Sequence, residues 1–202
     1  MAMSSAAQAQ REASLEGVVG YYRPLGHYDP ASVYVVGMPH QPSDLQGPLL
    51  GVSGRLGVSG RFAVAAQLAT ASSRSSTVMT PAGPVGPASA SVVLGTLLGQ
   101  FDVATNPGRV HLRLSTGPAF VRHGGEAYKS VGSSTSFAPA VGTSLVVPIW
   151  SHLRLSAGAT GLFYTTNISM PSALRGNAGQ LQRGRQRDLL LQFGAAWTSR
   201  SR

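Results

Sequence analysis

The sequence has no cysteine and carries little charge. The absence of cysteine excludes disulfides, thiolate metal sites and a cysteine nucleophile. Charged residues make up 11% of the 202 residues, well below the roughly 25% of ordinary soluble domains. The net charge is +9, carried almost wholly by arginine because Lys129 is the only lysine. No nucleic-acid-binding motif accompanies this charge, so we expect no nucleic-acid partner.

Long apolar runs are also missing. The stretch 62–66 is one of the longest, far short of the roughly 18–20 residues that a membrane-spanning helix needs. The 25 glycines and 13 prolines disfavour long helices of any kind, because both residue types destabilise a helix interior. A transmembrane strand needs only about 9–11 residues, so these observations leave a membrane-spanning barrel open.

The residues that are present alternate between apolar and small or polar types, as in β-strands. The clearest example is 109–121, where Val110, Leu112 and Leu114 share one face and His111 and Arg113 share the other. The same pattern predicts eight strands, at residues 14–23, 48–58, 62–72, 88–103, 109–121, 135–147, 153–166 and 187–199. The facing of 88–103 stays open because both of its faces are apolar.

The connections between these strands run long, short, long, short, long, short, long. Outer-membrane barrels have this order, with short periplasmic turns and long external loops. We therefore predict an all-β fold, an eight-stranded antiparallel up-and-down transmembrane barrel over 14–199, with both termini in the periplasm. Residues 1–13 are expected to be a disordered arm or a signal-peptide remnant, since 6–10 have the small residues of a cleavage site. Residues 200–202 form a tail.

Charge on the face opposite the apolar one indicates a polar interior, the inverse of a soluble barrel. Because an eight-stranded barrel is just wide enough for side chains to fill, these groups should meet. We predict one structural network in the lumen, which Asp102 joins if 88–103 turns its even positions inward. Tyr22 and His111 are further candidates. The principal members of the predicted lumen network are Glu16, Arg55, Gln67, Arg113, Arg154, Asp188 and Gln192.

The last predicted strand carries an alternating apolar pattern that ends on an aromatic residue: Leu191, Phe193, Ala195 and Trp197. It resembles the C-terminal assembly signal of small outer-membrane β-barrels, the family that includes OmpA-like and OmpX-like barrels. The resemblance covers residues 14–199 as a pattern of strands and loops. It implies a Gram-negative cell envelope and recognition by the outer-membrane insertion machinery.

Arginines in the last long connection suggest a lipid partner. Arg175, Arg183, Arg185 and Arg187 would lie outside the cell, where lipopolysaccharide is polyanionic, so they could contact its phosphates. A solvated loop is the alternative interpretation.

No residues with catalytic, cofactor or metal-ligand spacing stand out, so we expect neither an enzyme nor a cofactor. The leading hypothesis is a structural or surface-interaction role through four external loops. A narrow solute channel is the alternative. A lipid-modifying enzyme and a soluble lipocalin-like binder are the remaining hypotheses.

Overall fold

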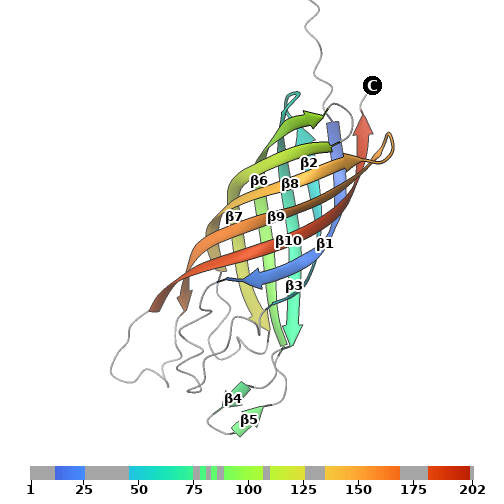
Figure 1. The fold of residues 1–202 in the computed structure, drawn as a ribbon. Coiled ribbons are helices and arrows are strands. Elements are labelled where there is room, and N and C mark those ends of the chain that lie inside the picture. Colours follow the sequence, from blue (N-terminus) through green and yellow to red (C-terminus); the bar gives the residue numbers. More distant parts are fainter. Residues whose placement is uncertain are drawn as a thin grey trace, which may run out of the picture.

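The computed structural model describes residues 12–25, 46–74, 78–80, 83–85, 89–106, 110–125, 135–168 and 182–200. Eight of the strands in these ranges close into one antiparallel barrel with the order β1-β10-β9-β8-β7-β6-β3-β2 (Figure 1). They are β1 (Glu12–Pro24), β2 (Gly47–Gly57), β3 (Phe62–Arg74), β6 (Ser89–Asn106), β7 (Val110–Gly125), β8 (Thr135–Pro148), β9 (Leu153–Ile168) and β10 (Gln182–Arg200). The predicted eight-stranded up-and-down barrel is confirmed.

The ends of the elements differ from the sequence-based prediction in a few places. Glu12 and Ala13 belong to β1 rather than to an N-terminal arm, and Arg200 belongs to β10. A small hairpin of β4 (Val78–Thr80) and β5 (Gly83–Val85) lies in the connection between β3 and β6, where no strand was predicted. Within the described ranges, no helix is long and apolar enough to cross a membrane.

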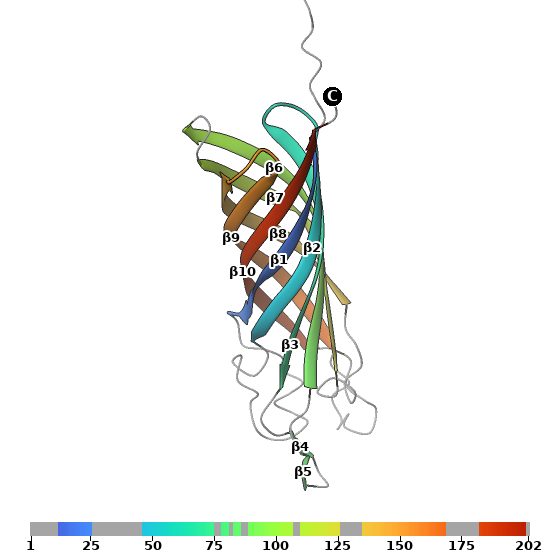
Figure 2. The ribbon, with the colours of Figure 1, turned by 90° about the vertical axis from the view of Figure 1, so that its right-hand side faces the viewer.

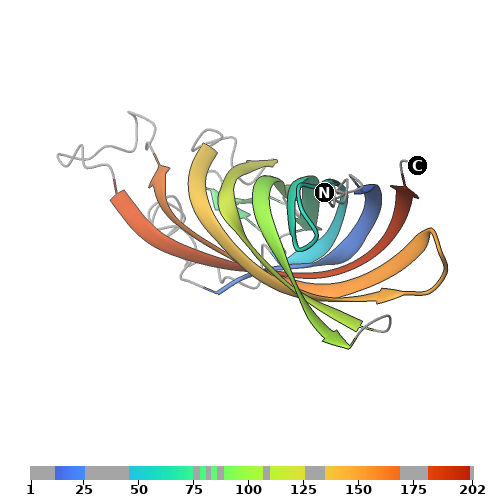
Figure 3. The same ribbon diagram turned by 90° about the horizontal axis from the view of Figure 1, so that it is seen from above.

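The two ends of the barrel are distinct. We call "turn end" the end at which β1 begins, β10 ends and the short segments 58–61, 107–109 and 149–152 join strands. The opposite end, towards which β4 and β5 lie in Figures 1 and 2, is the "loop end". In the view from above (Figure 3), the tilted strands curve around a common interior. Strands of 11 to 19 residues are long enough for a tilted crossing of a bilayer.

Side-chain facing follows the alternation of the sequence on every barrel strand. The outer wall is apolar over most of its height: Leu15, Leu68, Phe137 and Phe193 are exposed by 64%, 55%, 81% and 60%. All four acidic residues in the described ranges face the lumen instead: Glu12, Glu16, Asp102 and Asp188. The wall therefore has the inside-out polarity of a barrel surrounded by lipid.

Glycine allows close packing at one point of the lumen wall. A methyl group at Gly194 on β10 would collide with the Glu16 carboxylate and with Ser156 Oγ at 2.6 Å. The missing side chain thus makes room for two polar groups from the strands on either side of β10.

Candidate functional site

An ion-pair cluster fills the lumen near the turn end. Asp102 on β6 accepts hydrogen bonds from Arg55 Nη2 at 2.6 Å and from Arg113 Nε at 2.7 Å. Arg55 Nε also donates to Gln100 Oε1 at 3.1 Å. The side chains of Arg55 and Arg113 are only 11% and 8% exposed, so two nearly buried cations share this one carboxylate as their counter-charge.

The strand between the partners explains how this cluster forms. Asp102 lies directly opposite Arg113 across the β6–β7 pair. Arg55 is on β2 and must reach over β3 to meet Asp102. The inward residues of β3 on this path are Ala63 and Ala65, whose short side chains leave the space open. The same arrangement recurs at β10.

Two further contacts cross β10 at the turn end. Arg154 Nη2 on β9 forms an ion pair with Glu12 Oε1 on β1 at 2.5 Å. Ser156 Oγ donates a hydrogen bond to Glu16 Oε1. Ala196 pairs in register with both Glu16 and Arg154, so again a small residue on the middle strand lets side chains from its neighbours meet.

Several of the predicted lumen residues surround one small cavity. Glu16, Gln67, Arg113 and Gln192 line it, together with Gln100 and other residues, and its volume is about 60 Å³. That is room for a few water molecules at most, since each needs about 10–15 Å³ by this measure. The even positions of β6 face inward, which places Asp102 in the lumen as the conditional prediction required.

Asp188 does not join these residues, which corrects the prediction of a single network. It lies near the loop end of β10, 1% exposed. Its Oδ2 accepts hydrogen bonds from the hydroxyls of Tyr22 and Tyr164, each at 2.6 Å, and its Oδ1 accepts from Gln186 Nε2 at 2.9 Å. His123 stacks on Tyr164, with ring centroids 6.2 Å apart. Tyrosine and amide donors take the place of the predicted arginines.

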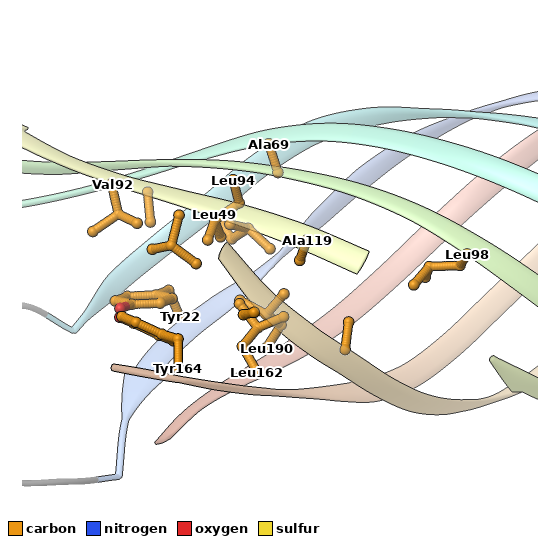
Figure 4. Packing of buried hydrophobic residues seen from close by; sticks show 14 residues of the cluster. Tyr22, Leu49, Ala69, Val92, Leu94, Leu98, Ala119, Leu162, Tyr164 and Leu190 are labelled. Carbon is orange, nitrogen blue, oxygen red and sulfur yellow. The ribbon is translucent and has the colours of Figure 1, made fainter. Parts of the chain in front are cut away.

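An apolar layer separates the two polar regions of the lumen. Its members face inward between the turn-end cluster and Asp188, and their side chains pack against one another (Figure 4). Four of the largest are at most 1% exposed: Leu49, Leu94, Leu162 and Leu190. The lumen therefore holds two polar clusters with apolar side chains between them, in place of the single polar network that was predicted.

Sequence reasoning omitted several polar residues that the structure places in the lumen. Continuing the alternation of residues 153–166 beyond Thr160 would have turned Tyr164 inward, on the face that carries Arg154. Glu12 was omitted because it was assigned to the N-terminal arm. Gln186 was assigned to a loop, although it precedes Asp188 by two residues and so shares its face.

The arginines that were expected in an external loop are mostly on a strand. β10 begins at Gln182, so Arg183, Arg185 and Arg187 are strand residues at the loop end, and only Arg175 lies outside the described residues. Arg185 and Arg187 are exposed on the outer wall, because side chains alternate between the two faces of β10 and Asp188 faces the lumen. The side chain of Arg183 is not among those described.

The residues of the predicted assembly signal all point outward from β10. Leu191, Phe193 and Trp197 are 41%, 60% and 62% exposed, and Ala195 lies between them on the same face. Trp197 stacks on His152 of the β8–β9 turn with ring centroids 5.7 Å apart, and Thr198 N donates to His152 O at 2.9 Å. These contacts fix the last strand to the turn end of the barrel.

Metal-binding geometry does not occur in the described ranges, where no group of three or more His, Cys, Asp or Glu side chains converges. His123 is 1% exposed and Asp188 is equally buried. Their neighbourhood therefore offers a substrate no direct access through the described wall.

No protein-family model matches this sequence, and no curated protein matches it either. Solved structures do match its fold. The outer membrane protein OprG from Pseudomonas aeruginosa superimposes with a TM-score of 0.62 at 12% identity, covering 96% of this chain and 98% of its own. Neisserial surface protein A gives 0.59 at 12% identity, covering 93% and 96%. Ail, the attachment invasion locus protein of Yersinia pestis, gives 0.53 at 8% identity, covering 95% and 99%.

These likenesses are likenesses of fold. They confirm that the chain has the architecture of the small outer-membrane barrels, the resemblance that the strand pattern predicted.

Proposed function

We propose that this protein is an outer-membrane barrel with a structural or surface-interaction role, exerted through four external loops. Both termini lie on the periplasmic side, and the loop end faces outward. The apolar outer wall and the likeness in fold to outer-membrane barrels support the membrane location. One of the similar structures is that of a protein named for attachment, which is compatible with a contact role for this fold.

The observation that carries the proposal is the filled lumen. An ion that travels along the axis would have to pass the apolar layer, where Leu94, Leu162 and Leu190 are at most 1% exposed. Such a layer offers no hydrogen-bonding group to replace the hydration shell, and moving a charge into apolar surroundings is strongly unfavourable. The lumen therefore favours a solid support for the loops over the alternative of a narrow solute channel.

Planar-bilayer recording tests this proposal. We expect the wild-type barrel to show no reproducible conductance steps. The variant Leu94→Ser/Leu162→Ser removes two large side chains from the apolar layer. It is the positive control, which shows that the recording detects an opened lumen. Insertion of both proteins is checked by the mobility shift between folded and heat-denatured protein on gels. Reproducible steps from the wild type would contradict the structural role and favour the channel.

The proposal includes the outer-membrane insertion machinery as a partner. The outward apolar pattern at the end of β10 supports this, because it would be readable before the barrel closes. We expect Phe193→Ala/Trp197→Ala to slow assembly in cells, whereas Val19→Ala/Leu68→Ala, on the same outer wall, should assemble at the wild-type rate. Equal rates for both pairs would contradict recognition of this segment.

Catalysis is not part of the proposed role. Mass spectrometry of envelope lipids with and without the protein should show no change in lipid structure, and a modified lipid would instead identify a lipid-modifying enzyme. A protein that stays monomeric in water without detergent would favour the lipocalin-like alternative.

A further inference from the structure

Arginines gather on the outer wall at the loop end, over β1 and β10. Arg23, Arg185 and Arg187 are all exposed and all face outward. Arg23 pairs with Leu189, so it lies diagonally across from Arg187, and Leu25 N donates to Arg187 O at 2.7 Å. Diagonal neighbours in an antiparallel pair are roughly 7–8 Å apart at Cα, and Arg185 follows Arg187 at a similar spacing along the strand. We call these three residues the arginine strip.

The strip lies at the border of the apolar wall. One step nearer the turn end, Tyr21 pairs with Leu191 and both are about 40% exposed. Phe163 on β9, which pairs with Arg187 on β10, is 46% exposed. Beside the arginines and on their turn-end side, the wall is thus suited to acyl chains. At the arginines themselves it offers guanidinium groups instead, the change that occurs where acyl chains give way to lipid headgroups.

The strip has no acidic neighbour on the described outer wall, since the described acidic residues all face the lumen. The turn end of the outer wall differs in composition. It presents Trp150 and Trp197, exposed by 71% and 62%, near the same border. The two ends of the wall are therefore chemically unequal, and only the loop-end border described here concentrates three positive charges on adjacent strands.

We propose that the arginine strip binds the phosphate groups of lipid A in the outer leaflet. This inference rests on the proposed function, because it requires the loop end to face that leaflet. Guanidinium groups present paired N–H donors that match phosphate oxygens and are weakly hydrated. Two adjacent strands place them on one side of the barrel, so one lipid molecule can lay its acyl chains along Tyr21, Phe163 and Leu191 while its phosphates meet the arginines.

Titration in vesicles tests the inference. The full chain is refolded into phosphatidylcholine vesicles that contain increasing fractions of bisphosphorylated lipid A, and binding is followed from the rise in the unfolding midpoint. A guanidinium that donates directly to a phosphate makes a charge-assisted hydrogen bond, which contributes about ten-fold in affinity or more, so Arg185→Gln/Arg187→Gln should weaken the apparent lipid A affinity by about 100-fold. Arg23→Gln should weaken it about ten-fold.

Two single variants are the matched controls. Arg122→Gln removes an outward arginine of β7 at the same end, where its partners across the sheet are Val93 and Thr135. Arg61→Gln removes an exposed arginine of the β2–β3 turn at the opposite end. Both change the net charge as Arg23→Gln does. Arg122→Gln should weaken the lipid A affinity by no more than the roughly five-fold that any arginine near an anionic surface contributes, and Arg61→Gln should leave it within about two-fold of wild type.

The outcomes separate the inference from the proposed function. Lipid A binding that is unchanged in the strip variants overturns the inference, as does equal stabilisation by phosphatidylglycerol, which would show only attraction to any anionic surface. Competition by millimolar inorganic phosphate alone would point to a free-phosphate site and also overturn it. In each of these cases, normal insertion and an intact heat-modifiable barrel leave the proposed function standing. Failure of the wild type to insert into any vesicle would overturn the membrane location itself.

Discussion

Asp102 holds together the polar half of the lumen, and replacing it by asparagine tests that role directly. The substitution keeps the shape of the side chain and removes its charge. In the wild type, one carboxylate accepts two charge-assisted hydrogen bonds, of 2.6 Å from Arg55 and 2.7 Å from Arg113. In Asp102→Asn the amide oxygen can still accept one of them, but the two guanidinium groups then lose the negative charge that lies between them.

The magnitude follows from burial. A hydrogen bond to a charged group contributes about 1.5–3 kcal/mol, and removing one partner of a buried ion pair costs about 3–5 kcal/mol. Asp102 is 21% exposed, which places the expected loss of unfolding free energy near the lower end, at about 3 kcal/mol. Thr96→Val is the matched control on the same strand. Thr96 is 8% exposed, and its Oγ1 has no hydrogen-bond partner among the described residues, so its removal should change stability by less than about 1 kcal/mol.

Equilibrium urea unfolding of the barrel in lipid vesicles measures both values. A loss for Asp102→Asn no larger than that for Thr96→Val would refute the reasoning. It would mean that Arg55 and Arg113 are solvated in a water-filled lumen, and the channel alternative would gain support. Recovery of stability in Asp102→Asn/Arg55→Gln would strengthen the electrostatic explanation, because one of the two opposed charges is then removed.

Three other substitutions have clear expected effects, each measured by the same unfolding assay. Leu114→Arg places a charge on the outer wall, where Leu114 is 47% exposed, and should cost about 2–4 kcal/mol or prevent insertion; normal insertion would contradict the assigned facing of β7. Gly194→Ala should cost about 1–3 kcal/mol because the new methyl group meets Glu16 and Ser156, whereas Gly17→Ala, with nothing within 4 Å, should be nearly neutral. Tyr164→Phe removes one of three donors to buried Asp188 and should cost about 1.5–3 kcal/mol, a prediction that fails if Tyr164→Phe and wild type unfold at the same urea concentration.

Much of the barrel could be predicted from local sequence because a transmembrane strand has to alternate along its whole length. Parity alone assigns Arg113, Arg154 and Asp188 to the lumen face, and the structure places all three there. Position along the barrel axis could also have been deduced. The strand that carries Asp188 begins at the loop end, whereas the strands that carry Glu16 and Arg113 begin at the turn end. Counting from the strand ends would have separated Asp188 from the arginines.

The loop-end arginines show where local reasoning fails. Residues 182–186 read as a polar connection because they include none of the β-branched or aromatic residues that favour strands. In the structure Gln182–Gln186 pairs with Tyr164–Ile168 and extends the β9–β10 ladder. Pairing with an already formed neighbour overrides propensity, because each added residue satisfies its backbone hydrogen bonds. Arg185 consequently acquires a fixed outward direction that a loop would not give it.

Which lumen side chains meet depends on how far apart their strands are in the chain. Asp102 and Arg113 are on neighbouring strands, which residues 107–109 join. Even here the pairing register shifts between Ala104 and Asn106. Counting strand partners back from Asn106 and Val110 would therefore pair Asp102 with the wrong residue, one position away from Arg113. The contact between Tyr22 and Asp188 depends on closure of the first strand on the last, which no turn dictates. Closure fixes the stagger of all eight strands at once. The partner of a buried polar group in a small barrel is therefore a property of the closed sheet, and the small residues of intervening strands, such as Ala65 and Ala196, are the local features that make distant partners reachable.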